Sequence, residues 1–166
     1  SKLSGLKQID LFSCELKSLP KGFGNLVKLT QLDLRKNNLT YLPESFGKLV
    51  NLWRLDLGQN ELEYLPESIG DLIGLKMLMA NHNKLSKLPE SIGNLTNLTS
   101  ISMIFNQLKR LPESFGKLIN VGHMMFTCNQ LTSLPASIGN LKRLESVYLD
   151  YNQLQELPPS FCDLEA

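Results

Sequence analysis

A motif of 23 residues occurs seven times along the chain, and this repetition constrains the fold more than any other feature. The copies begin at residues 6, 29, 52, 75, 98, 121 and 144, with no insertion or deletion between them. Each follows the pattern LxxLxLxxNxLxxLPxxIGxLxx, as in LTQLDLRKNNLTYLPESFGKLVN from Leu29. A unit this short cannot bury its own apolar face, so successive units must stack on one another. The repetition therefore predicts a solenoid.

Within each unit, leucine or another apolar residue occupies places 1, 4, 6 and 11 of the motif. The alternation of apolar and polar residues around places 3 to 7 predicts a short strand with one buried face. In the second unit, Leu32 and Leu34 should point into the core and the residues beside them should point outward. We expect the strands of successive units to pair in parallel.

The rest of the motif predicts a turn and a short return segment. Asparagine at place 9, replaced by Cys14 in the first unit, should hydrogen-bond the backbone of its own turn and of the next unit. Proline at place 15 suits the start of a short helical turn, and the apolar residue at place 18 should fill the core. The glycine at place 19 should turn the backbone with positive φ. The glycines at this place in the first six units are Gly24, Gly47, Gly70, Gly93, Gly116 and Gly139.

On these residues the chain resembles the 23-residue class of leucine-rich repeats, found in Ras-suppressor and Scribble-like proteins, plant intracellular Ras-group proteins and leptospiral proteins. The resemblance implies an α/β solenoid, namely a right-handed, curved superhelix with a parallel sheet on its concave face. Short 3₁₀ or extended segments would lie on the convex face. It also implies a protein-binding role and brings no catalytic residues. Residues 1–166 would then form one domain, with residues 1–5 as the tail of a preceding repeat.

Composition narrows the class of partner. The chain has 17 basic and 16 acidic residues, so nothing in its charge favours nucleic acid or an anionic membrane. No apolar run is long enough to span a membrane. Cys14, Cys128 and Cys162 lie in different units, which favours a reducing compartment. A cytoplasmic location is therefore favoured, while secretion or surface display by a bacterium stays open.

The places that vary between units predict where a partner binds. Places 3, 5, 7 and 8 should face the concave side, and from the fourth unit onward they become apolar and aromatic. A large exposed apolar area usually marks an interaction site. We predict that the partner contacts Met77, Met79, Ile104, Phe105, His123, Met125, Tyr148 and Tyr151. The alternative is a degenerate part of the array, because Ala80, Met103, Met124 and Phe126 replace leucine at core places there.

A column of aspartates forms the second feature of the variable places. Asp10, Asp33 and Asp56 occupy place 5 of the first three units, where like charges on neighbouring strands repel. Arg35 and Arg54 are diagonal neighbours that would compensate this charge. A partner with lysine or arginine side chains along the column is the alternative, so Asp33, Asp56 and Arg54 are also candidate binding residues. A calcium site fits less well, because cations surround the column.

No catalytic or metal-binding constellation is predicted. His82 and Cys128 both occupy place 8, two units apart, or about 10 Å at strand spacing. A nucleophile and its base need about 3 Å. His82 and His123 lack a third residue that would complete a metal site. We therefore expect no enzymatic activity, no metal and no cofactor.

Three functions follow as hypotheses. The first is a non-catalytic protein–protein interaction module that binds a protein on its concave face. The second is the recognition part of a larger signalling protein or enzyme whose effector domain lies outside this chain. The third is a structural array with end-to-end self-association, since the first unit presents Leu6, Ile9, Leu11 and Leu16 with only residues 1–5 to cover them.

Overall fold

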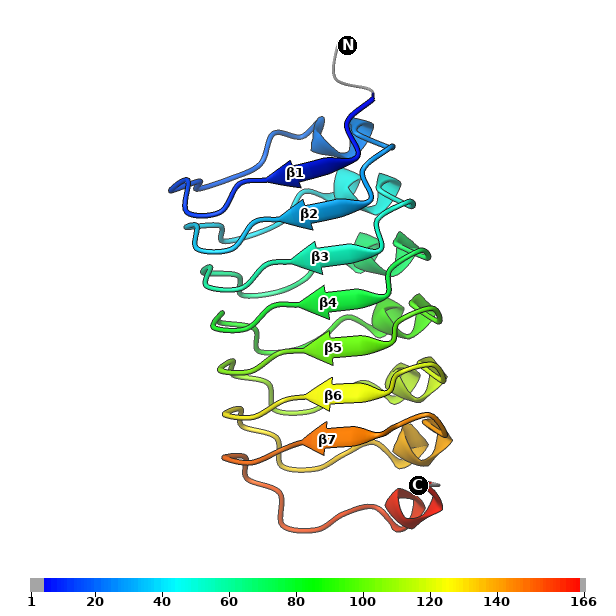
Figure 1. Ribbon diagram of the computed structural model, residues 1–166. Helices are drawn as coiled ribbons and strands as arrows, with labels where there is room; N and C mark the ends of the chain where they lie inside the picture. Colours follow the sequence, from blue (N-terminus) through cyan, green and yellow to red (C-terminus); the bar gives the residue numbers. More distant parts are fainter. Residues whose placement is uncertain (1–4, 165–166) are drawn as a thin grey trace.

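The computed structural model describes residues 5–164, which form a stack of similar layers, each with one strand and one short helical segment (Figure 1). The strands are β1 (Gln8–Asp10), β2 (Gln31–Asp33), β3 (Arg54–Asp56), β4 (Met77–Met79), β5 (Ser100–Ser102), β6 (His123–Met125) and β7 (Ser146–Tyr148). The 3₁₀ helices are η1 (Phe23–Asn25), η2 (Glu44–Lys48), η3 (Glu67–Asp71), η4 (Glu90–Asn94), η5 (Glu113–Lys117), η6 (Ala136–Asn140) and η7 (Pro159–Asp163). The predicted solenoid is confirmed.

The seven described strands form one parallel sheet in chain order. Each residue pairs with the residue 23 positions further on, so that Leu32 lies opposite Leu55 and Leu55 opposite Leu78. Places 3, 4 and 5 of the motif therefore form columns that cross the sheet. The predicted alternation is confirmed, because Leu32 and Leu34 are buried whereas Arg35 is exposed.

The core lies between the sheet and the 3₁₀ helices, and it runs the length of the stack. Apolar residues of the strands meet those at place 18 of the helices, and Phe46, Ile69 and Phe115 are fully buried there. The core substitutions Ala80, Met103, Met124 and Phe126 are fully buried as well. The core thus stays closed beneath the part of the sheet that carries the predicted binding residues.

The place-9 asparagines join adjacent layers. The amide nitrogen of Asn60 donates to the carbonyls of Leu57 in its own turn, at 3.0 Å, and of Leu34 in the preceding layer, at 2.9 Å. Its amide oxygen accepts from the N–H of Leu39, also in the preceding layer, at 3.0 Å. The expected bonds to the next unit were therefore wrong in direction: the side chain reaches back. These bonds satisfy buried backbone groups.

The expectation of positive φ at the place-19 glycines is wrong. No glycine within residues 5–164 has positive φ. The physical reason for glycine is close approach, because a Cβ on Gly93 would lie 2.3 Å from the carbonyl oxygen of Ser114 in the next 3₁₀ helix. The left-handed backbone occurs instead at Glu15, with φ of 57°, and at place 8 of every unit, with φ between 54° and 58°. The place-8 residues are Ser13, Lys36, Gln59, His82, Phe105, Cys128 and Tyr151.

The first described layer is less covered than the central layers. Ile9, Leu11 and Leu16 are half-buried and Leu6 is exposed, whereas their counterparts two layers on are fully buried. The predicted tail over residues 1–5 lies outside the described residues except for Gly5. End-to-end self-association stays a prediction. None of the described helices is long and apolar enough to cross a membrane.

Candidate interaction surface

The predicted apolar residues all lie on the outward face of the sheet and on the turns that follow its strands. Strand β4 carries Met77 and Met79, β6 carries Met125, β7 carries Tyr148, and the next turns carry Ile104, Phe105 and Tyr151. We call these seven residues the apolar surface. Three of its members are strongly exposed: Phe105 at 50%, Tyr148 at 53% and Tyr151 at 80%. The methionines and Ile104 are half-buried.

Two serines of β5 divide the apolar surface into two parts. Met125 lies directly opposite Tyr148 on β7, but Ser102 separates it from Met79 on β4. Ser102 is only 2% exposed, and its hydroxyl donates to the side-chain oxygen of Asn81 at 2.6 Å. Small side chains therefore lie between the two methionine-bearing strands. The sequence had predicted one continuous apolar surface instead.

Phe105 extends the apolar surface by stacking on a histidine. Its ring lies 4.6 Å from that of His82, with 15° between the planes. From the sequence, His82 was considered only as a possible catalytic base or metal ligand, although its place 8, shared with Phe105 of the next unit, was the signal for this contact. The imidazole of His123, exposed on β6, lies 2.8 Å from the hydroxyl of Ser146 and 4.0 Å from the carboxylate of Glu145.

The turns hold the aromatic side chains on a defined backbone. Phe105 and Tyr151 both have φ of 55°, a conformation that residues other than glycine rarely adopt. Neighbouring layers fix this geometry, because the N–H of Phe105 donates to Thr127 at 3.0 Å and its carbonyl accepts from Asn83 at 3.2 Å. The exposed Phe105 ring is thus carried by a backbone that is bonded on both sides.

The charged residues on β2, β3 and the following turn form ion pairs with one another. Asp33 lies opposite Asp56, as predicted. The guanidinium of Arg35 binds both carboxylate oxygens of Asp33 at 2.9 and 3.0 Å, and it lies 3.5 Å from Asp56. Arg54 reaches Asp56 at 4.0 Å. The arginines therefore supply the compensating charge that the sequence suggested.

Burial acts differently on the two aspartates. For Asp33, partial burial raises the pKa, but the hydrogen bonds and charge of Arg35 outweigh it and lower the pKa below its usual value. For Asp56, deeper burial outweighs the N–H of Gly58 and the charge of Arg35, so the pKa is raised. The pKa values of the two carboxyl groups are therefore shifted in opposite directions.

At the N-terminal end of the same face, an aromatic side chain contacts two cationic side chains of the next layer. The aromatic ring of Phe12 lies 5.3 Å from the guanidinium carbon of Arg35 and 5.7 Å from the ammonium of Lys36. Cations at this distance are attracted to the ring face. In the described part of the chain, no group of three or more histidine, cysteine or acidic residues could hold a metal ion.

Comparisons with known proteins agree with this architecture. One family model, described as leucine rich repeat, matches residues 2–62, and a second with the same description matches residues 143–164. Among solved structures, the plant peptide hormone receptor RGFR1 in complex with RGF2 is similar with a TM-score of 0.80 and 28% identity over 97% of this chain. A leucine-rich repeat protein of Leptospira interrogans is similar with a TM-score of 0.58 and 28% identity over 97% of this chain.

A third similar structure is the leucine-rich repeat ectodomain of the membrane receptor kinase GASSHO1/SCHENGEN3 from Arabidopsis thaliana, in complex with CASPARIAN STRIP INTEGRITY FACTOR 2. It has a TM-score of 0.66 and 32% identity over 99% of this chain. The chain spans 59% of the leptospiral protein, 31% of RGFR1 and 23% of the GASSHO1 ectodomain. Among the curated proteins compared with it, none matches. The motif, the layered sheet and these similarities together show that the chain belongs to the leucine-rich repeat family.

Proposed function

We propose that this chain is a non-catalytic binding module that recognises a protein or peptide through the apolar surface on β4–β7. The observation that carries the proposal is the exposure of Phe105, Tyr148 and Tyr151 on a regular, closed frame. Aromatic side chains of this size contribute strongly to interfaces when a partner covers them. Their exposure in the free chain is unfavourable, so a partner that buries them gains binding free energy.

The half-buried methionines suit the same role. Met77, Met79 and Met125 present flexible thioether side chains beside the rigid aromatic rings. The serines between them leave room for an apolar side chain of the partner to approach β5. We expect such a side chain to sit between Met79 and Met125.

Charged neighbours would orient the partner. Asp33 and Asp56 are already engaged by Arg35, so we propose that they contribute less to binding than the sequence suggested. Arg54 and His123 flank the apolar surface on β3 and β6. A rim charge such as that of Arg54 affects the association rate and the specificity more than the affinity.

Similar proteins support a peptide or protein as partner. The peptide hormone receptor RGFR1 was solved in complex with RGF2, and the leucine-rich repeat ectodomain of GASSHO1/SCHENGEN3 was solved in complex with CASPARIAN STRIP INTEGRITY FACTOR 2. Both share the layered frame with this chain. Which ligand this chain takes depends on its own variable residues, and these are what the following experiment tests.

The test uses peptides selected from a random display library on the immobilised protein. Replacing Phe105 and Tyr148 together by alanine should weaken their binding at least tenfold, measured by fluorescence polarisation. Lys48→Ala, an exposed change on η2, is the matched control and should leave binding unchanged. The far-ultraviolet circular dichroism of both variants should equal that of the original protein. Undiminished binding by the double variant would show that the partner contacts another face.

A second candidate function is the recognition part of a longer signalling protein. The similarity to the ectodomain of a membrane receptor kinase favours it. Reading the full-length gene product for a kinase, GTPase or ligase segment decides between the two functions. Finding no effector segment there would reject the second.

A further inference from the structure

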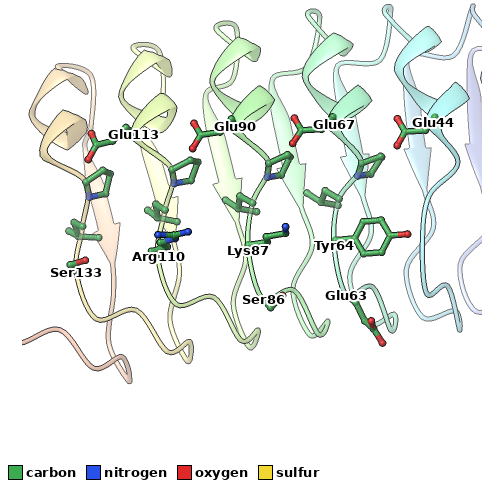
Figure 2. Close-up of a pocket in the computed structure, with 18 residues that line it drawn as sticks. Glu44, Glu63, Tyr64, Glu67, Ser86, Lys87, Glu90, Arg110, Glu113 and Ser133 are labelled. Carbon is green, nitrogen blue, oxygen red and sulfur yellow. The ribbon is translucent and has the colours of Figure 1, made fainter.

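A groove crosses several layers on the face of the stack turned away from the sheet, and Figure 2 shows it with the strands behind. Its volume is about 850 Å³. The return segments between the place-9 turns and the 3₁₀ helices form its floor, with Leu65, Leu88, Leu111 and Leu134 nearly buried beneath it. Proline rings lie beside these leucines. The floor is therefore regular and apolar.

One wall of the groove is acidic. Glu44, Glu67, Glu90 and Glu113 occupy place 16 of successive layers, and Figure 2 shows their carboxylates in one row, pointing the same way. All four are exposed. Glu67 and Glu113 accept backbone N–H groups of the next 3₁₀ helix at 3.3 Å, which fixes their direction along the wall. Each carboxylate retains further acceptor capacity.

The other wall carries one aromatic and two basic side chains, and the acidic Glu63 lies beyond Tyr64 at its edge. Tyr64, Lys87 and Arg110 occupy place 13 of three successive layers and line the groove across from the glutamates. All three are exposed. Among residues 5–164, no ion pair within 4.0 Å joins the glutamate wall to Lys87 or Arg110. The apolar floor thus separates opposite charges, which stay available to a molecule lying between them.

We propose that this groove binds an extended segment of a partner protein whose side chains are alternately basic and acidic. Successive side chains of an extended chain point to opposite sides. A segment lying along the groove can therefore direct its basic side chains to the glutamate wall. Its acidic side chains then face Lys87 and Arg110. The aliphatic stems of the basic side chains would cover the leucine and proline floor.

The length of the acidic wall sets the length of the segment. Glu44 and Glu113 are three layers apart, which is about 14 Å at the strand spacing of about 4.8 Å. An extended chain rises about 3.3 Å per residue, so about five residues span the wall. Three basic side chains at alternate positions then match it. This site is independent of the apolar surface on the sheet.

The first experiment compares two labelled peptides, Lys-Glu-Lys-Glu-Lys-Glu and Lys-Lys-Lys-Glu-Glu-Glu, by fluorescence polarisation at low ionic strength. Their composition and net charge are equal, so only the order of charges differs. The alternating peptide should bind at least fivefold more tightly, and added salt should weaken it, because the charges are exposed. Equal affinity of the two peptides would overturn the proposal.

Wall variants locate the site. Lys87→Glu with Arg110→Glu should weaken the alternating peptide at least fivefold, and so should Glu44→Gln with Glu90→Gln. Neither glutamate of the second pair holds a side-chain hydrogen bond in the described residues, so this pair tests charge rather than folding. The Phe105→Ala, Tyr148→Ala variant should bind the alternating peptide normally, which separates this site from the sheet surface. Unchanged binding by both wall variants would reject the groove as the site.

Discussion

The two halves of the sheet face share one backbone and one register but treat their side chains differently. On β2 and β3, Arg35 binds Asp33 and lies near Asp56, so the charges satisfy one another. On β6 and β7, Met125 lies opposite Tyr148, and the Tyr148 side chain is 53% exposed. Among the described residues, the hydroxyl of Tyr148 has no side-chain hydrogen bond. The charged side chains of one half are therefore paired with one another, whereas the aromatic side chain of the other half stays exposed.

The difference arises only from the variable places, because the core beneath both halves is closed. Leu55 of β3 and Met124 of β6 are both fully buried in the core. A repeat array can thus change its outward columns without disturbing the frame. Polar residues that pair within the face reduce what a partner can gain there, whereas exposed aromatic residues increase it. The boundary between the halves lies between β3 and β4.

Extending the aspartate column across that boundary should have the largest effect on stability. Met79 lies directly opposite the buried Asp56, so Met79→Asp places two carboxylates side by side. No arginine occupies β4 or its turn to neutralise the new charge. We expect the free energy of unfolding to fall by about 2–3 kcal/mol at pH 7, from repulsion and lost packing. Urea denaturation followed by circular dichroism measures it.

Met79→Leu is the matched control for this change. It keeps the volume and apolar character of the side chain, so it should cost less than about 1 kcal/mol. At pH 3, where the introduced carboxylate is protonated, the cost of Met79→Asp should shrink. A cost that does not depend on pH would show that packing, rather than charge, separates the two halves.

Removing Arg35 should have the next largest effect, because it leaves two facing carboxylates with reduced compensation. We expect Arg35→Ala to lower the free energy of unfolding by about 1–2 kcal/mol. The lower end reflects the exposure of the guanidinium, which weakens each pair through solvent screening. Lys36→Ala is the control, since Lys36 contacts the ring of Phe12 and neither aspartate. Equal losses in both variants would show that Arg35 acts through Phe12 instead.

Much of the fold could be predicted because the period is strict. The 23-residue spacing dictates the register, so that Leu32, Leu55 and Leu78 align without further information. The proline at place 15 predicted a short helical turn, which the structure has as a 3₁₀ helix at Glu44–Lys48 and its equivalents. The outward columns followed from the same register, and the apolar surface lies where they predicted.

The features that the sequence did not reveal depend on atoms from a neighbouring layer. Gly93 is required by the carbonyl of Ser114, which lies 21 residues away, and a local pattern suggested positive φ instead. The stacking of His82 on Phe105 likewise joins adjacent layers. In the charged groove opposite the sheet, Glu90 and Lys87 lie on opposite sides of an apolar floor. The repeat spacing does not predict the width of that floor. Periodicity predicts columns, but not the distances between different columns.

Titration of the charged half should give the smallest effects and the sharpest test, because its two aspartates should respond to pH with opposite signs. The pKa of Asp33 is lowered in the folded state. Its contribution to stability is therefore present above its unfolded pKa, near about 3.9, and is lost as the pH falls through the folded value. Asp33→Asn should thus be less stable than the original protein at pH 7, and this difference should vanish towards pH 2.

Asp56 should behave in the opposite way, because burial raises its pKa in the folded state. Its favourable contribution is present below its unfolded pKa and is lost as the pH rises through the folded value. In Asp56→Asn the amide oxygen can still accept the N–H of Gly58, which Asp56 binds at 3.2 Å, but no charge has to be buried. Relative to the original protein, this variant should therefore gain stability between pH 3 and pH 7. Urea denaturation at several pH values measures the gain, and a loss that grows with pH would show instead that attraction to Arg35 and Arg54 outweighs the cost of burying the charge.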